Sequence, residues 1–271
     1  MSHRRLDSQV RKDTTLRAAK HLALLLAIGN LACHGATAST ADEAPPKLER
    51  MPEALEVRFA LSAAPPHLRD GAATYVLDPA KGYVLSHQGT NGVSCLVVRT
   101  DWQFTKQTFR DDIYWAVCYD AEGSKTLLQD YVYAAELRAR GMGTTKVHDE
   151  VTKTFHDGAS PNPNRTGVAY MIAPVMRGYT NRQEPVTMNM PHYMFYAPHV
   201  TDADIGGHGF SEQYPFVLRM SPGRDDYIIM LVGESEKAKI LHDSGDLLAQ
   251  LCSYRAVLCT TDETRKQTPV S

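Results

Sequence analysis

The sequence of 271 residues predicts an α+β domain with a mostly antiparallel sheet and helices on one face. Runs of β-branched and aromatic residues dominate the first part of the chain, whereas helical patterns appear in the middle and at the end. Turn signals that contain Gly, Asn or Pro separate several of the strand-like runs. The regular alternation of strand and helix that is typical of a doubly wound parallel sheet is missing.

The first half of the chain reads mainly as strands. A short helix is predicted over residues 53–60, because Pro65 and Pro66 would end it. Residues 78–82 form a turn signal, and Asn91-Gly92 lies between two β-rich runs, which predicts a hairpin there. The strands predicted in this half are residues 73–77, 83–86, 93–99 and 113–119.

The second half mixes helices with further strands. A helix is predicted over residues 124–140, ended by Gly141, although residues 126–133 could also form a strand. A polar helix follows over residues 144–156, and a last one over residues 235–255 has a possible break at Ser244-Gly245. The remaining strands are predicted at residues 168–174, 186–197, 216–219 and 227–232.

The N-terminal segment has the three-part pattern of a secretory signal peptide. A basic stretch precedes an apolar run over residues 22–32, and Ala36-Thr37-Ala38 is a small-x-small cleavage signal. The apolar run is about half of the ~20 residues that a membrane-spanning helix needs. A periplasmic or secreted protein is therefore expected. Lipid attachment at Cys33 is the less favoured alternative, because Asn30 stands where a large aliphatic residue is usual.

This segment divides the chain into four predicted parts. They are a signal peptide at residues 1–38, a flexible mature N-terminus at 39–52, a single α+β domain at 53–260 and a flexible tail at 261–271. The signal carries six of the 29 basic and two of the 31 acidic residues, so the mature chain has a formal charge of −6. A net negative charge does not provide the basic surface that binds nucleic acid or an anionic membrane.

Four cysteines remain after the predicted cleavage site. An even number in an oxidising compartment favours disulfides, and the preferred pairing is Cys95–Cys118 with Cys252–Cys259. The first pair joins two predicted strands and the second would hold the C-terminal part. Four buried free thiols are the alternative. No CxxC motif and no Cys/His cluster at zinc spacing occurs in the sequence.

Residues 187–199 are the most unusual stretch. Met188, Met190, His192 and Met194 would point to one face of an extended strand, and His199 follows closely. Thioethers and imidazoles favour soft metals such as copper, which makes Met190, His192, Met194 and His199 candidate metal ligands. Same-face neighbours on a strand stand ~6.6 Å apart, which is too far for several of them to share one ion easily. A core strand, bent by a bulge at Pro191, is the competing interpretation.

The same stretch offers a candidate ligand surface. Tyrosine is over-represented, with thirteen residues against seven Phe and two Trp. A tyrosine-lined strand can bind a planar or carbohydrate ligand, because each ring has an apolar body and a hydroxyl. The candidate ligand-binding residues are His192, Tyr193, Tyr196 and His199. Half-buried strand tyrosines without a ligand are the alternative.

A hydrolase is the hypothesis from a different class. It would use His192, His199 or His208, the last of which lies in a Gly-rich loop with Ser211 and Asp202. No G-x-S-x-G elbow is present, and a capped helical turn ended by Gly206-Gly207 is the favoured interpretation of this loop. The sequence does not decide whether the protein is an enzyme. Non-catalytic binding of a small ligand or soft metal is the first expectation, and the oligomeric state is open.

Three segments of the chain carry a resemblance. They are residues 89–97 with GTNG before Cys95, residues 118–123 with the sequence CYDAEG, and residues 191–198 with the sequence PHYMFYAP. In these segments the chain resembles a group of uncharacterised secreted bacterial proteins, over residues 54–255. The resemblance implies an exported bacterial domain, and it transfers no catalytic or binding residue.

Overall fold

The computed structural model describes residues 48–99, 102–103, 109–179, 184–197, 199–219 and 226–260. The predicted signal peptide, most of the predicted flexible N-terminus and the predicted C-terminal tail lie outside these residues. Packing begins early, because Leu48 and Met51 are already buried. Arg50 also forms an ion pair with Asp78, with 2.6 Å between Nη2 and Oδ2.

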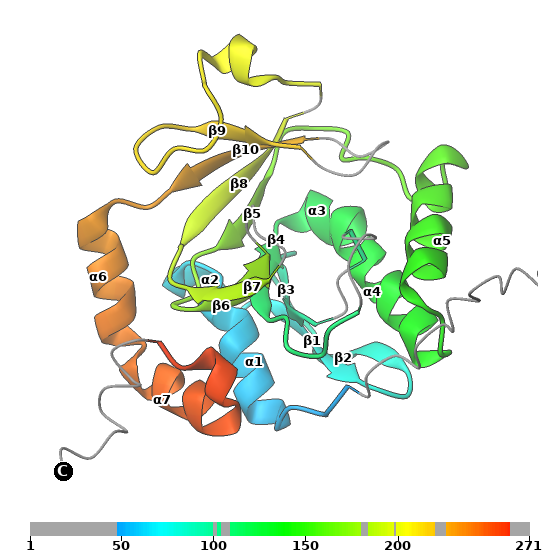
Figure 1. Ribbon diagram of the computed structural model, residues 1–271, viewed down its shortest axis with the longest axis horizontal. Coiled ribbons are helices and arrows are strands. Elements are labelled where there is room, and N and C mark those ends of the chain that lie inside the picture. The colour runs from blue at the N-terminus through cyan, green and yellow to red at the C-terminus, as the bar shows by residue number, and fades with distance from the viewer. Residues whose placement is uncertain are drawn as a thin grey trace, which may run out of the picture. The chain divides into compact units, whose positions relative to one another are not determined.

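An eight-stranded sheet organises the described chain (Figure 1). Its strand order is β2-β1-β3-β4-β5-β8-β10-β9, and every neighbouring pair is antiparallel except β1 and β3. The predicted α+β class with a mostly antiparallel sheet is confirmed. The strands are β1 (Ala73–Asp78), β2 (Gly82–His87), β3 (Ser94–Val98), β4 (Trp115–Tyr119), β5 (Val168–Met171), β8 (His192–Ala197), β9 (Phe216–Leu218) and β10 (Asp226–Leu231).

The Asn91-Gly92 turn does not form the predicted hairpin. β2 pairs with β1, and β3 lies on the other side of β1 and runs parallel to it. The loop before β3 crosses back over the start of β1, since the backbone amides of Thr90 and Asn91 both donate to Gly71 O. The hairpin forms instead at residues 78–82, where Lys81 N donates to Asp78 O and Gly82 has a φ of 93°.

Helices cover both faces of the central strands rather than the single face predicted (Figure 1). Successive side chains of β3 and β4 alternate between two apolar clusters, as the two-residue period of a strand requires. One cluster packs against α4 and α5, and the other against α1 and α7. The helices are α1 (Glu53–Ser62), α2 (Pro66–Arg69), α3 (Ala121–Lys125), α4 (Leu127–Ala139), α5 (Thr144–His156), α6 (Glu234–Asp243) and α7 (Gly245–Tyr254), with 3-10 turns η1 (Asp202–Ile205) and η2 (Ala256–Leu258).

Most predicted helices are confirmed, including the break at Ser244. Residues 127–133 form the predicted helix and not the alternative strand. The predicted helix divides into α3 and α4 at Thr126. None of the helices in the described ranges combines the length and the apolar composition that crossing a bilayer requires.

The predicted strand over residues 186–197 is two strands in two sheets. β7 (Pro185–Met188) pairs with β6 (Met176–Tyr179) in a separate two-stranded sheet, whereas β8 begins at His192 in the main sheet. Pro191 lies at the junction, where its missing N–H cannot donate to a ladder. The shared parity of Met188 with His192 therefore does not place them on one face.

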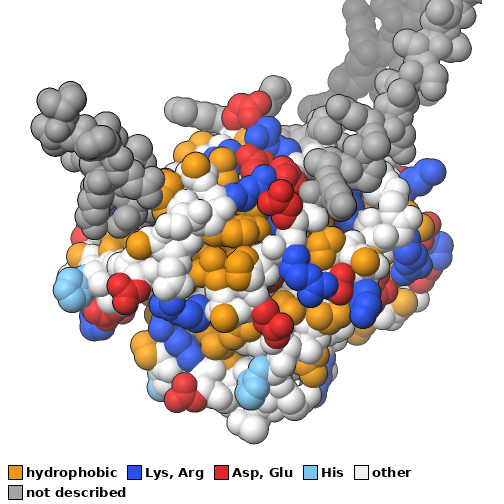
Figure 2. Space-filling model, turned by 90° about the horizontal axis from the view of Figure 1, so that it is seen from below, with side chains coloured by type: hydrophobic (Ala, Val, Ile, Leu, Met, Phe, Trp, Pro, Cys, Tyr) orange, Lys and Arg blue, Asp and Glu red, His pale blue; other side chains and the backbone are white. Residues whose placement is uncertain are grey.

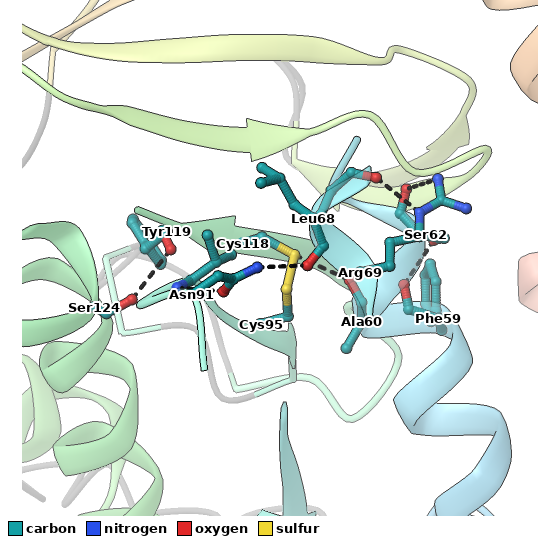
Figure 3. Close-up of a disulfide and its surroundings, with 12 residues drawn as sticks. Phe59, Ala60, Ser62, Leu68, Arg69, Asn91, Cys95, Cys118, Tyr119 and Ser124 are labelled. Carbon is teal, nitrogen blue, oxygen red and sulfur yellow. Dashed lines mark hydrogen bonds between the residues drawn. A yellow bond between two sulfur atoms is a disulfide. The ribbon is translucent and has the colours of Figure 1, made fainter. Parts of the chain in front are cut away.

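Both predicted disulfides are present. Cys95 and Cys118 lie directly opposite each other on β3 and β4, with 4.0 Å between their Cα atoms. Figure 3 shows this bond beside α1, where Cys118 Sγ lies 3.4 Å from Ala60 O. The second disulfide, Cys252–Cys259, joins α7 to the residue after η2. Two disulfides fit an oxidising compartment.

Asp120 connects three elements next to this disulfide. Its carboxylate caps α3 by accepting from the amides of Glu122 and Gly123, and it also accepts from Val168 N in β5. The hydroxyl of Tyr196 in β8 donates to the same carboxylate at 3.1 Å. A Cβ on Gly123 would overlap this hydroxyl.

Gly123→Ala is therefore expected to destabilise the protein, although alanine is the better helix former. The new methyl group would force the buried Tyr196 ring to shift, at a cost of about 1–3 kcal/mol in the free energy of unfolding. Urea denaturation measures this. Gly233→Ala is the control, since its Cβ would meet nothing within 4 Å. An equal effect of the two variants would contradict the close packing around Gly123.

Candidate functional site

The predicted ligand-binding residues on β8 do not share a face. His192 and Tyr196 point into the core, where both side chains are almost fully buried. Tyr193 points to the opposite face and makes an edge contact with Tyr170, with 6.1 Å between the ring centroids. His199 is exposed and lies two residues beyond the end of the strand. The structure therefore separates the predicted set instead of assembling it.

Two of the buried side chains are held by structural hydrogen bonds. His192 Nδ1 lies 2.7 Å from Met190 O, and burial lowers the pKa of this imidazole. Tyr196 donates to Asp120 and lies 3.1 Å from Val168 O. Burial first, and then the Asp120 charge, raise the pKa of the Tyr196 hydroxyl well above its usual value. These bonds fix the strand within the sheet.

The predicted metal set of Met190, His192, Met194 and His199 is not brought together either. His192 and His199 lie at opposite ends of β8, whose five residue steps span about 17 Å. Only His192 and Met194 remain same-face neighbours, with Met171 of β5 opposite His192. Within the described ranges, no group of three or more His, Cys, Asp or Glu side chains could hold a metal ion.

The histidines proposed for hydrolysis lack a catalytic neighbour in the described residues. In this part of the chain, none of His192, His199 and His208 forms a hydrogen bond or ion pair with a carboxylate or hydroxyl side chain, and the contact of His192 is to the Met190 carbonyl. The Gly-rich loop instead contains the capped turn that the sequence offered as an alternative. Thr201 and Asp204 form a capping box around η1, and Gly206 ends it with a φ of 68°.

A cavity of about 210 Å³ lies elsewhere, between α4, the last turn of α5 and the loop that follows. α4 presents a stripe of side chains at helical spacing, and Asp130 lies at its buried edge. The left-handed Gly158 reverses the chain after α5, and Ser160 N then donates to Thr154 O. The lining residues are Gln129, Asp130, Val132, Tyr133, Glu136, Thr154, Ala159 and Ser160.

Several hydrogen-bond donors of this lining are already used within the protein. The Ser160 hydroxyl donates to Asp130 Oδ1 at 2.7 Å, and the Thr154 hydroxyl donates to Val151 O at 2.6 Å. The amide of Gln129 donates to Ser124 O at 2.8 Å. Oxygen atoms, which are hydrogen-bond acceptors, make up most of the polar lining, including the carboxylates of Asp130 and Glu136. The lining is therefore rich in acceptors.

The lining is also acidic, because its charged members are Asp130 and Glu136 alone. Glu136 is 45% exposed and has a long contact of 3.4 Å with Arg140. Asp130 is 4% exposed, so its charge acts in a less polar environment. On the face of the molecule in Figure 2, by contrast, Lys/Arg and Asp/Glu side chains are interspersed.

Sequence reasoning missed this cavity. The residues at 129–136 read as one face of a helix, which is the ordinary surface of such an element. Only the position of residues 154–160 against that face makes it concave. Comparison with protein-family models, curated proteins and solved structures found no match. The resemblance to secreted bacterial proteins therefore stays a prediction.

Proposed function

We propose that this chain is an exported, non-catalytic binding protein that holds a small ammonium ligand in the cavity between α4 and α5. The observation that carries the proposal is the acceptor-rich lining around the buried Asp130. An ammonium group donates three hydrogen bonds and accepts none, so it complements oxygens whose own protons are used elsewhere.

The size and shape of the cavity support a small occupant. Its volume of about 210 Å³ is that of about seven water molecules in the liquid. Tyr133 and Val132 supply an aromatic and an aliphatic surface beside the carboxylates. A small apolar stem can lie against these side chains while its charged end meets Asp130. A cation near the tyrosine ring is additionally favoured by the ring quadrupole.

Binding is favoured over hydrolysis by the composition of the lining. A hydrolytic site needs a nucleophile or a water held by a general base next to donors that stabilise an oxyanion. The Ser160 hydroxyl donates to Asp130, and no His, Lys or Arg is among the lining residues. The separation of His192 from His199 weighs against the soft-metal hypothesis, which needed both side chains at one ion.

Three probes of equal length test the charge of the ligand. Calorimetry with 1,4-diaminobutane, 1,4-butanediol and succinate compares a cation, a neutral molecule and an anion of similar size. We expect the diamine to bind, the diol to bind more weakly and succinate not to bind. Asp130→Asn should weaken diamine binding at least tenfold, because the amide oxygen can still accept from Ser160 while the charge is lost.

Asp149→Asn is the matched control. Asp149 lies on α5, its side chain is 70% exposed, and it is not part of the lining. Its loss changes the net charge by the same amount, and diamine affinity should stay within twofold. Binding of succinate, or equal losses in the two variants, would contradict an ammonium site at Asp130.

A further inference from the structure

The side chain of Arg99 is buried and has no hydrogen-bond partner among the residues that the structure describes. Arg99 follows β3 and continues the alternation of Cys95 and Val97, which face α1 and α7. The side chain is fully buried, and none of Nε, Nη1 and Nη2 has a hydrogen-bond partner among the described residues. A guanidinium carries five N–H donors and a permanent charge. An isolated charge at such a position costs several kcal/mol unless something balances it.

Arg255 lies beside the same tyrosine ring as Arg99, but its charge is balanced by a carboxylate. Both guanidinium groups lie near the ring of Tyr114, with 5.1 Å from Arg99 Cζ and 5.8 Å from Arg255 Cζ to the ring centroid. Arg255 pairs with the Asp111 carboxylate at 2.8 Å and donates to Asp111 O and the Tyr114 hydroxyl. Arg99 has the aromatic contact without an anionic partner, and a ring contact alone does not replace five hydrogen bonds.

Two further polar groups near Arg99 are also unsatisfied. Glu56 of α1 is fully buried, and Oε1 accepts from Leu77 N at 2.9 Å while Oε2 has no partner among the described residues. The Tyr254 hydroxyl of α7 is buried and makes no hydrogen bond of normal geometry to a described residue. The charge of Arg99 affects the pKa of both groups, so both lie within its electrostatic reach.

The other charged groups near Glu56 have partners of their own. Arg50, which precedes α1, pairs with Asp78, and Glu53 accepts from the Ser86 hydroxyl. Glu56 and Arg99 do not hydrogen-bond each other, because Glu56 Oε2 and all three guanidinium nitrogens of Arg99 have no hydrogen-bond partner among the described residues. The three guanidinium nitrogens of Arg99 just after β3, the Tyr254 hydroxyl of α7 and Glu56 Oε2 of α1 therefore all lack a hydrogen-bond partner among the described residues.

We propose that one small monovalent anion, chloride, is bound between the Arg99 guanidinium, the Tyr254 hydroxyl and the Glu56 carboxyl. Because Arg99 and Glu56 are fully buried, an ion bound between them would be enclosed by protein, which favours a monatomic ion over a larger oxyanion. Arg99 supplies the charge and several N–H donors, and Tyr254 supplies a hydroxyl donor. This site is separate from the ammonium cavity and does not depend on it.

Glu56 makes the site sensitive to pH. Burial raises the pKa of Glu56 to about 7, against the lowering effects of the Leu77 amide, Arg99 and Arg50, while Glu53 raises it further. Below that pH, Oε2 carries a proton and can donate to the anion. Above it, the carboxylate repels the anion. Chloride should therefore bind more tightly at pH 6 than at pH 8.

Thermal unfolding in chloride and in gluconate at equal ionic strength tests the proposal. The wild-type midpoint should rise by about 3–6 °C when chloride reaches ten times its dissociation constant, and gluconate should give no such rise. Arg99→Met should abolish the response to chloride. Arg255→Met is the matched control and should keep it, although that variant loses its own ion pair.

Three further measurements test the anion site even if Arg99→Met does not fold. Tyr254→Phe should weaken the chloride response several-fold, and Glu56→Gln should make it equal at pH 6 and pH 8. Anomalous diffraction from a crystal grown in bromide should show an ion next to Arg99. Equal midpoints in chloride and gluconate, with no bromide peak, would mean that water occupies the space and would overturn the anion site.

Discussion

Replacing Cys95 and Cys118 together by alanine is expected to lower the free energy of unfolding by about 3–4 kcal/mol. The two residues are 23 positions apart, and closing a loop of that length removes this much freedom from the unfolded chain in the entropic model. Both side chains are fully buried between the sheet and α1, so the shortened side chains also lose packing. Urea denaturation of the oxidised proteins measures the loss.

The Cys252–Cys259 pair provides the comparison. Its sequence separation is seven, for which the same model gives about 2–2.5 kcal/mol. The double alanine variant at these positions should therefore lose less stability. In the wild type, mild reductant should open this bond first, because Cys259 is only partly buried whereas Cys95 and Cys118 are inaccessible. A larger loss of stability in the Cys252/Cys259 variant than in the Cys95/Cys118 variant would contradict this prediction.

Glu56→Gln is expected to stabilise the protein at alkaline pH and to have little effect near pH 4.5. The pKa of Glu56 is about 7 in the folded protein and about 4.5 in the unfolded chain. Between these values the folded state holds a proton that the unfolded state releases, so wild-type stability falls as pH rises and levels off above about 7. Over this pH range, the free energy of unfolding of the wild type falls by about 3 kcal/mol because of this one group. The glutamine can keep the bond from Leu77 N without a charge.

Urea denaturation at pH 4.5, 6 and 8, at one fixed chloride concentration, measures this difference. Glu53→Gln is the control on the same helix, since Glu53 is exposed and its contact is the Ser86 hydroxyl. The Glu53 variant should show no gain that grows with pH. A constant difference between wild type and Glu56→Gln across the three pH values would contradict the raised pKa.

Much of the local structure could be predicted because it depends on neighbouring residues. Gly141 and Gly158 both adopt positive φ just after a helix, as the C-terminal glycine pattern requires. The alternation in residues 93–98 predicted a strand, and an oxidising compartment with an even cysteine number predicted the disulfides. These signals act over a few residues or through composition, so they can be read without the fold.

Strand pairing was harder to predict, and for a physical reason. Asn91-Gly92 is a good turn sequence, yet it does not say which strand comes back beside which. The 78–82 turn pairs β1 with β2 along one edge of β1. β3 therefore lies along the other edge of β1. Pro191 marked an interruption, but only the pairing of β7 with β6 shows that the chain changes sheets there.

The α+β class, a preferred cysteine pairing and most element positions could be predicted from the sequence, because periodicity, turn residues and composition are local properties. Which side chains lie together depends instead on how distant segments pack. His192 and His199 are close in sequence but lie at opposite ends of a strand, whereas Asp130 and Ser160 are 30 residues apart and share a hydrogen bond. Likewise, nothing in the sequence around Arg99 predicted that its guanidinium would be buried without a hydrogen-bond partner in the described part of the chain, because that depends on how α1 and α7 pack over the sheet.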